Sequence, residues 1–414
     1  MPIGAPSAPI ERRSWTGDRG LAFLLLAALV AAFPWDDTLG YPTETLSIVK
    51  LLGLALGVAF VASAPWRSPP VLAPILVPMA VFLALVAASW LTSGDVGGGS
   101  GPTARYVQYA ALVVLVIQVV RTSEGIVTLF GVLTASAAAA AVVGLSRFLV
   151  GTADRASGPI GDANDFAYVL ATAVPLGLHL VAREGRARWA WGAAVVAIVA
   201  GTAGTLSRGA LIGLAVAAVW AVLARRVGLR SVAAAAAVLV VGAGFALVLE
   251  RPFIEERLGA KGVIAGDNVD SRAALWRGAV DMAEDHPLLG VGTGLYPARA
   301  ADYVVDDPLH LVRPVAHNAY LEVLAENGVP ALVAFLAFVA GTGLLLHRSH
   351  HEARRHGRSD LEAIATALQS SHIVAVVGAL FLSVQIAPPL WFVGALAVVL
   401  RALVRRSAPD AASP

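Results

Sequence analysis

The sequence predicts an all-α, polytopic membrane protein with about twelve transmembrane helices and one large external loop. Three observations support this fold class. Hydrophobic residues make up 57% of the 414 residues and charged residues only 14%, whereas a soluble domain carries about a quarter charged residues. The apolar residues also form long blocks, each able to cross a bilayer core of roughly 30 Å as a helix. The basic residues, finally, collect in alternate loops between these blocks.

The apolar blocks predict spans at 20–35, 45–64, 71–92, 105–121, 126–149, 164–182, 189–205, 209–224, 231–249, 329–347, 363–386 and 388–404. The first block follows Arg12, Arg13 and Arg19, as a signal peptide would. Its core from Leu21 to Phe33 is long and has no clear small-residue cleavage site, so we expect a retained anchor. The other spans are rich in Ala, Gly, Ser and Thr, which let helices pack closely in lipid.

The arginines predict the orientation of the chain. One alternate set of loops and both tails hold 18 of the 30 basic residues: Arg12, Arg13, Arg19, Arg67, Arg121, Arg183, Arg186, Arg188, Arg225, Arg226, Arg230, Arg348, Arg354, Arg355, Arg358, Arg401, Arg405 and Arg406. Positive charge marks the cytoplasmic side. We therefore expect a multi-pass protein of the cytoplasmic membrane with both termini inside. His347, His350, His351 and His356 fall in a solvated cytoplasmic loop by this prediction.

Three regions follow from this topology. Residues 1–249 hold spans one to nine, residues 250–328 form the external loop, and residues 329–414 hold spans ten to twelve and the cytoplasmic tail. Loops as long as 250–328 are usually functional. Within this loop, 270–286 predicts an amphipathic helix, because its apolar residues recur at helical spacing. Asp270 or Ser271 is the expected N-cap.

A glycine-rich segment, PLLGVGTGLYP at 287–297, follows the predicted loop helix. Gly290, Gly292 and Gly294 resemble a phosphate-binding loop, but such a pattern is weak without its structural context. A turn near the membrane surface is the better interpretation.

His317 is the strongest candidate for chemistry on the external side. Asn318 is placed to cap the short helix that carries Tyr320 and Glu326, so His317 lies at a helix N-terminus, where the dipole favours a neutral imidazole. Nearby arginines would lower the pKa of His317 from its intrinsic value of about 6.5. A neutral histidine can act as a general base for a sugar hydroxyl. The alternative is an interfacial histidine without a catalytic role.

Three external arginines occupy positions that disfavour a cation without a partner. Arg155 precedes span six, Arg208 lies between two closely spaced spans, and Arg272 opens the loop helix at its positive end. Helix N-termini and guanidinium groups both bind phosphate. These arginines therefore predict a diphosphate site. The alternative is structural pairing with carboxylates, for which the candidates are Asp154, Asp162, Asp270 and Glu284.

Several segments resemble the family of O-antigen ligases and O-antigen polymerases. They are SRAALWRGAVDMAEDHPLLGVGTGLYP at 271–297, AHNAYLEVLAENGVPAL at 316–332, GPIGDANDFAYVLATAVPLGL at 158–178 and TLSRGALIGL at 205–214. The His-Asn-x-Tyr-Leu stretch before a span is the most specific. The resemblance covers roughly the second two-thirds of the chain.

The resemblance implies a GT-C-like, metal-independent glycosyltransferase without a cofactor. Its donor would be an undecaprenyl-diphosphate-linked glycan, and its acceptor a lipid or glycan hydroxyl at the outer face of the membrane. His317 matches the catalytic histidine of the family, Arg208 and Arg272 match its arginines, and Arg155 matches less closely. Asn318, Tyr320 and Glu326 would support the site.

Alternatives remain open at this point. Ligase and polymerase share this chemistry, and the compact loop favours the ligase. A secondary transporter would need paired, broken spans in two repeats, which the sequence does not show. A metal-dependent enzyme would use Asp36 and Asp37, although no further metal ligands converge on them. The net charge of +2 gives no indication of nucleic-acid binding.

Overall fold

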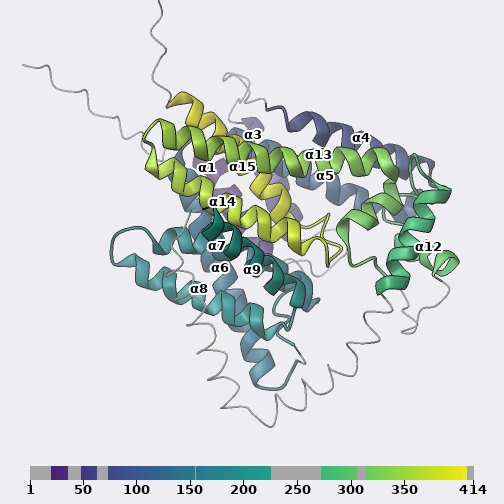
Figure 1. Cartoon of the computed structure of the whole chain (residues 1–414), viewed down its shortest axis with the longest axis horizontal. Coiled ribbons are helices and arrows are strands. Elements are labelled where there is room, and N and C mark those ends of the chain that lie inside the picture. Colours follow the sequence, from purple (N-terminus) through teal and green to yellow (C-terminus); the bar gives the residue numbers. More distant parts are fainter. Residues whose placement is uncertain are drawn as a thin grey trace, which may run out of the picture.

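The computed structural model describes residues 20–35, 48–62, 73–153, 155–224, 272–304 and 314–407. Within these ranges every regular element is a helix, and the long helices pack into a bundle (Figure 1). In chain order the helices are α1 (Gly20–Ala32), the 3-10 turn η1 (Phe33–Trp35), α3 (Ile48–Ala62), α4 (Leu76–Thr92), α5 (Val96–Val119), α6 (Ser123–Leu149), α7 (Ala163–Val181), α8 (Ala187–Gly204), α9 (Arg208–Leu223), α12 (Tyr296–Tyr303), α13 (Ala319–Arg355), α14 (Ser359–Gly378) and α15 (Pro388–Arg406). Residues 272–285 are also helical.

The predicted spans that fall within the described residues each coincide with a helix. Six helices are long and apolar enough to cross a membrane: α5, α6, α7, α13, α14 and α15. The apolar helices α1, α3, α4 and α9 are shorter. The span at 231–249 lies outside the described residues, so the count of twelve stays a prediction, as does the GT-C-like fold. The helices are those expected of a multi-pass membrane protein.

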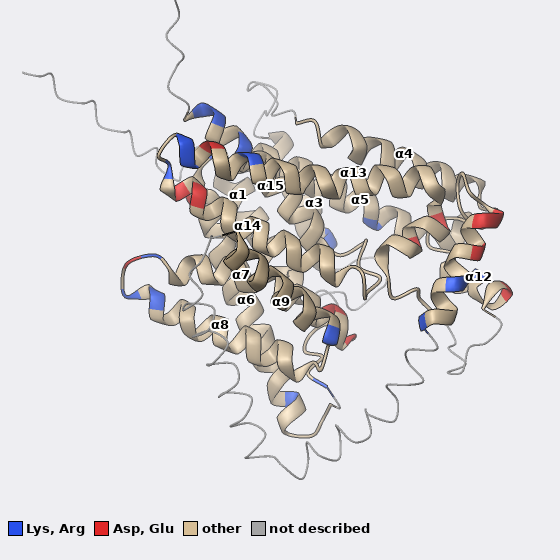
Figure 2. Ribbon diagram, in the orientation of Figure 1, with Lys and Arg blue, Asp and Glu red and all other residues tan. Residues whose placement is uncertain are grey.

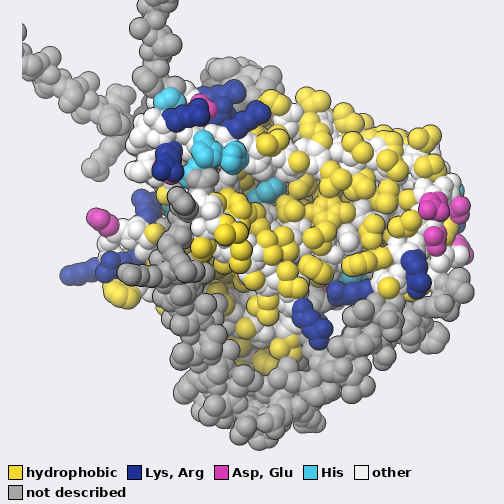
Figure 3. Space-filling model, viewed as in Figure 1, with side chains coloured by type: hydrophobic (Ala, Val, Ile, Leu, Met, Phe, Trp, Pro, Cys, Tyr) yellow, Lys and Arg dark blue, Asp and Glu magenta, His cyan; other side chains and the backbone are white. Residues whose placement is uncertain are grey.

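The outer surface of the bundle is apolar. Figure 3 shows a broad area of hydrophobic side chains on one face, and Val58, Val107 and Leu344 are each more than half exposed. Exposed apolar areas of this size mark surfaces that contact lipid or another protein. Inside the bundle, Gly201 of α8 approaches Ala141 of α6 so closely that a Cβ at Gly201 would overlap the alanine. The predicted role of small residues in helix packing is seen here.

Helix α13 joins the predicted short helix after Asn318 to the predicted span, and it continues further toward the C-terminus than the sequence predicts. It begins at Ala319 and is kinked at Gly328, which has a non-helical φ of 79°. It then continues to Arg355, so the prediction of a cytoplasmic loop from His347 onwards was wrong for this stretch. His350 is buried and lies 3.4 Å from a carboxylate oxygen of Glu362. Packing against α14 explains why the helix extends past its apolar part.

Helix α14 ends earlier than predicted. The apolar pattern predicted a span to residue 386, but α14 ends at Gly378 and residues 379–387 form an irregular connection to α15. Polar groups hold this connection in place: Trp391 donates its indole N–H to the backbone oxygen of Gln385 at 2.9 Å. Side chains of the connection face the candidate site described below.

The glycine-rich segment 287–295 packs against the kink of α13. The N–H of Val291 donates to the backbone oxygen of Ala325 at 2.9 Å. Gly290 has a φ of 66°, and a Cβ there would overlap the backbone of Glu326. These contacts agree with the predicted turn. They do not support a phosphate loop, because the N–H groups of Val291 and Gly292 donate to carbonyl oxygens of α13.

Charge is distributed unequally between the two ends of the bundle (Figure 2). Basic side chains gather where α13 and α15 end, at Arg354, Arg355, Arg405 and Arg406. The loops at the other end, which include 93–95, 150–162 and 379–387, lie where α5 and α7 begin and α14 ends. The candidate site lies at this second end, opposite the arginine-rich end.

Candidate active site

His317 lies directly before α13. Its φ is 49°, in the left-handed region that residues other than glycine rarely occupy. Its N–H donates to the Ser383 hydroxyl at 3.1 Å. Asn318 caps α13, because its side-chain oxygen accepts from the N–H groups of Tyr320 and Leu321. The structure therefore places His317 at a helix N-terminus, with its backbone held on both sides.

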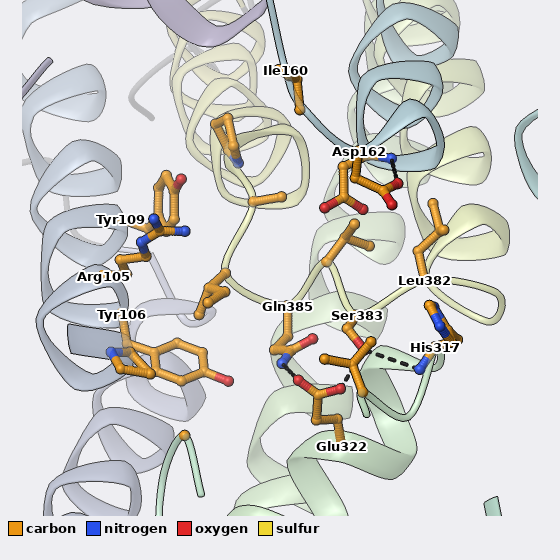
Figure 4. Close-up of a pocket in the computed structure, with 18 of the residues that line it drawn as sticks. Arg105, Tyr106, Tyr109, Ile160, Asp162, His317, Glu322, Leu382, Ser383 and Gln385 are labelled. Carbon is orange, nitrogen blue, oxygen red and sulfur yellow. Dashed lines mark hydrogen bonds between the residues drawn. The ribbon is translucent and has the colours of Figure 1, made fainter. Parts of the chain in front are cut away.

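A buried carboxylate in the first turn of α13 organises the backbone around His317. Glu322 accepts hydrogen bonds from the N–H of Ala316 at 3.1 Å and from the side-chain amide of Gln385 at 2.8 Å. It also accepts from the hydroxyl of Ser383, which in turn accepts from the N–H of His317 (Figure 4). A buried carboxylate needs such partners, since an isolated one would be strongly destabilising. Glu322 is thereby linked to His317 through Ser383.

The helix at 272–285 is attached to the same segment. Trp276 donates its indole N–H to the backbone oxygen of Ala316 at 2.9 Å. The hydroxyl of Tyr296 donates to the backbone oxygen of Leu275 at 2.7 Å. Leu275 is buried as predicted, whereas Val280, predicted on the same apolar face, is 39% exposed. The contact of Trp276 fixes the start of this helix beside His317.

Arg272 lies near both Arg208 and His317. Burial lowers the pKa of Arg272 most, and the charge of Arg208 lowers it further, while the charge of Asp162 acts in the opposite direction. Burial and then the charge of Arg272 lower the pKa of His317. Within the described part of the chain, neither arginine makes a hydrogen bond or ion pair. Pairing with Asp162 or Glu284 is thus not observed, while Asp154 and Asp270 lie outside the described residues. Two guanidinium groups close together favour a bound anion, although the negative charge of Asp162 also lies near Arg272.

The backbone before Arg208 is strained in the same way as at His317. Leu206 has a φ of 56°, and it and His317 are the residues other than glycine with positive φ in the described ranges. A left-handed conformation costs such a residue about 1–2 kcal/mol. Strain of this kind concentrates at functional sites, because the surrounding contacts hold a geometry that the chain would not adopt alone.

The imidazole of His317 favours its neutral form. Burial lowers the pKa of His317 most, the positive charge of Arg272 lowers it further, and the negative charge of Asp162 acts in the opposite direction. Both main causes destabilise the imidazolium cation. The prediction from the sequence, that arginines would keep this histidine neutral, agrees with these surroundings.

Arg155 makes structural contacts that Arg208 and Arg272 lack. Its Nε–H donates to the backbone oxygen of Thr205 at 2.6 Å, and its second guanidinium nitrogen donates to Asn164 at 2.7 Å. Burial lowers the pKa of Arg155 most, and Arg272 lowers it further. Arg155 therefore ties the loop before α7 to the turn before α9, and its charge lies near the other two arginines.

Tyr320 and Glu326 both point toward neighbouring protein groups. The hydroxyl of Tyr320 donates to the backbone oxygen of Val376 in α14 at 3.0 Å. Glu326 accepts from the N–H of Tyr296 at 3.2 Å, and it also lines a cavity beside His317. The contacts of Tyr320 support the position of α13, so this residue acts at a distance from the cavity.

The cavity beside His317 has a volume of about 400 Å³. Its lining comes from six parts of the chain: Phe33; Pro102, Arg105, Tyr106 and Tyr109; Ile160, Asp162, Asp165 and Val169; Gly294 and Pro297; Val315, His317, Glu322 and Glu326; and residues 382–388. Figure 4 shows Arg105 and Tyr109 on the wall opposite His317. Of the residues that the sequence predicted, His317 and Glu326 line this cavity, whereas Arg155, Arg208 and Arg272 lie outside its lining.

Several residues of this cavity were not predicted from the sequence. Arg105 begins a predicted span, and an ionisable side chain within a span is a functional signal that could have identified it. Ser383 and Gln385 were assigned to a transmembrane span. The polar residues and the two prolines in SVQIAPP at 383–389 are the signal for a broken helix there.

No group of three or more potential metal ligands occurs among the described residues. Asp36 and Asp37, the acidic residues of the alternative metal-dependent interpretation, lie outside the described residues.

Comparison with known protein families gives a match to part of the chain. A family model described as O-antigen ligase matches residues 193–336. This segment is an O-antigen ligase family domain. No curated protein matches the chain.

The O-antigen ligase domain includes Arg208, Arg272 and His317, so the three residues that lie together in the structure also fall within the matched segment. Arg105, Asp162 and the connection at 379–387 lie outside it. Members of the O-antigen ligase family are glycosyltransferase-like enzymes of the membrane that act on lipid-linked glycans. The cavity is thus built partly by the family domain and partly by the helices that flank it.

Proposed function

We propose that this protein transfers a glycan from undecaprenyl diphosphate to an acceptor hydroxyl at the outer face of the cytoplasmic membrane. The observation that carries this proposal is the pair of arginines, Arg208 and Arg272, which make no ion pair with any described residue, together with a neutral His317 beside Arg272 at the arginine-poor end of the bundle. The match to the O-antigen ligase family supports the same reaction class.

In the proposed reaction, His317 removes the proton from the acceptor hydroxyl. The hydroxyl oxygen then forms a bond to the anomeric carbon of the donor glycan, and the bond between that carbon and the phosphate oxygen breaks. The leaving group is the lipid diphosphate, which carries the electrons of the broken bond. Arg208 and Arg272 stabilise its charge as it departs. These cations perform the electrostatic role that a metal ion has in other transferases, so the reaction is metal-independent.

The acceptor decides between two enzymes of the same family. A ligase transfers the glycan to a foreign lipid or protein, and a polymerase transfers it to another lipid-linked chain. The arrangement of His317 and the arginines fits both. Reconstitution of the full chain with an undecaprenyl-diphosphate-linked oligosaccharide, followed by mass analysis, separates them, because extended chains indicate a polymerase and a glycan on a foreign acceptor indicates a ligase.

The same assay tests the proposed base and the proposed anion site. His317→Ala should lower the turnover number by about 10²- to 10⁴-fold, the contribution of a general base, and Arg272→Ala should also lower the rate of transfer. EDTA should leave the rate unchanged. His286→Ala is a matched control, since His286 is exposed in the same loop region. Normal transfer by a well-folded His317→Ala variant, or solute uptake without transfer, would contradict the proposal.

A further inference from the structure

Two buried polar groups face the cavity beside His317 without a partner. Tyr106 is 0% exposed and Gln385 is 2% exposed, and both line the cavity. Within the described residues, neither the hydroxyl of Tyr106 nor the side-chain oxygen of Gln385 makes a hydrogen bond. Leaving a buried polar atom unsatisfied costs about 1–3 kcal/mol. The two atoms therefore indicate that something with hydrogen-bonding groups occupies the cavity.

Neighbouring contacts fix the direction of both groups. The amide nitrogen of Gln385 donates to Glu322 at 2.8 Å, and since a carboxylate only accepts, the amide oxygen must point the other way. The ring of Tyr106 packs edge-on against Phe82, with ring centroids 5.2 Å apart, and against Trp391. Figure 4 shows the Tyr106 hydroxyl and the Gln385 side chain on the same side of the cavity.

The chemistry of the lining identifies the class of ligand. A phenol hydroxyl can donate a hydrogen bond and an amide oxygen accepts one, and a ligand hydroxyl satisfies both. Phe33 and Tyr109 supply apolar surface for the face of a ring. The carboxylates of Asp162 and Asp165 also accept from hydroxyls and repel phosphate. They share the lining with one cationic side chain, Arg105. The volume of about 400 Å³ lies within the range of small-molecule sites.

We propose that this cavity is the acceptor site and that it takes an uncharged sugar ring, whose hydroxyls bind Tyr106 and Gln385. The assignment as acceptor rests on the proposed function. His317 lines the same cavity, so a ring bound there presents a hydroxyl to the base. Arg208 and Arg272 lie outside the lining, and the diphosphate of the donor binds on their side. The two substrates thus meet at His317.

The test uses the full chain in lipid nanodiscs and saturation-transfer NMR with glucose, galactose, mannose and N-acetylglucosamine, each compared with glucose 6-phosphate. At least one uncharged sugar should bind, and it should bind more tightly than the phosphate ester. Tyr106→Phe should weaken that binding by roughly fivefold, the value of one hydrogen bond. Tyr168→Phe is the matched control: the hydroxyl of Tyr168 is also buried without a partner, but this residue does not line the cavity.

Three results would overturn the acceptor site: no binding of any uncharged sugar, tighter binding of glucose 6-phosphate, or equal binding by the Tyr106→Phe and Tyr168→Phe variants. This readout needs no donor, so it is independent of glycan transfer. Sugar binding that depends on Tyr106 in a protein without transferase activity would refute the proposed reaction and keep the site. Active transfer with an acceptor KM that is the same in the Tyr106→Phe and Tyr168→Phe variants would refute the acceptor site and leave the proposed reaction intact.

Discussion

The positive charge of Arg272 acts on His317 as well as on the diphosphate that we propose to bind there. Burial is the larger cause of the lowered pKa of His317, and Arg272 is the next. A base with a lowered pKa is neutral down to a lower pH, and it loses activity only when the pH falls through that pKa. Arg272 therefore extends the working range of the enzyme toward acid.

Replacement of Arg272 by glutamine should show both effects in one experiment. Without the guanidinium the pKa of His317 rises, so the acidic limb of the profile of kcat/KM against pH moves to higher pH. At neutral pH, kcat/KM should fall by roughly 10- to 100-fold, because a charge-assisted hydrogen bond contributes about 1.5–3 kcal/mol. Arg277→Gln, an exposed position on the same helix, should keep the wild-type profile. An unshifted acidic limb in the Arg272 variant would refute the coupling.

Single residues also show which parts of the site could be predicted from the sequence. His317 and Arg272 could be predicted because each lies at a helix start beside a recognisable pattern. Tyr106 could not, because it resembles an ordinary residue of a span, and for Gln385 the sequence signals only a broken helix and not a place in the site. Gln385 is placed at the cavity by its hydrogen bond to Glu322, and Tyr106 by the packing of its ring against Phe82. Both contacts join segments that lie apart in the sequence.

At the level of elements, the close contact between the glycine-rich segment and the kink of α13 holds the loop against the membrane helices. Gly290→Ala should destabilise the protein, since the added Cβ would overlap the backbone of Glu326. Gly94→Ala is the control: Gly94 also has a positive φ of 78°, but its Cβ would meet nothing within 4 Å. In both variants, the left-handed conformation of the new alanine costs about 1–2 kcal/mol.

The overlap at Gly290 should add roughly 1–3 kcal/mol to that cost. Thermal unfolding of the two purified variants, followed by tryptophan fluorescence, measures the difference. A Gly290→Ala protein as stable as Gly94→Ala would show that the segment can move away from α13 without loss.

Most helices could be predicted from runs of apolar residues. The errors in their predicted ends have one physical cause. Hydropathy reports which residues tolerate lipid, and it does not report where the backbone hydrogen bonds stop. The apolar pattern of span 363–386 continues past Gly378, although the helix ends there. The apolar pattern also failed to predict that α13 continues to Arg355. The last part of this helix is polar and is stabilised by packing against α14.

At the scale of the whole molecule, the uneven distribution of arginine predicts which end faces the cytoplasm. The chain contains no cysteine, so single cysteines can report on this directly. Ser100→Cys lies in the first turns of α5 at the end that holds the site, and Ser359→Cys opens α14 at the arginine-rich end. Both serines are exposed.

In sealed cells, a membrane-impermeant maleimide should label Ser100→Cys and leave Ser359→Cys unlabelled until the membrane is permeabilised. The opposite pattern would place the site in the cytoplasm. Labelling of both positions in sealed cells would contradict a bundle that crosses the membrane.

The strained backbone at Leu206 and His317 limits how far the thermal stability of this protein can be raised without loss of the proposed activity. A search for thermostable variants would select Leu206→Gly, which relieves an unfavourable dihedral angle next to Arg208. Such a variant should have a higher melting temperature and a lower turnover number, since glycine would hold the position of Arg208 less firmly. In the proposed enzyme, thermal stability and turnover are therefore opposed at this turn.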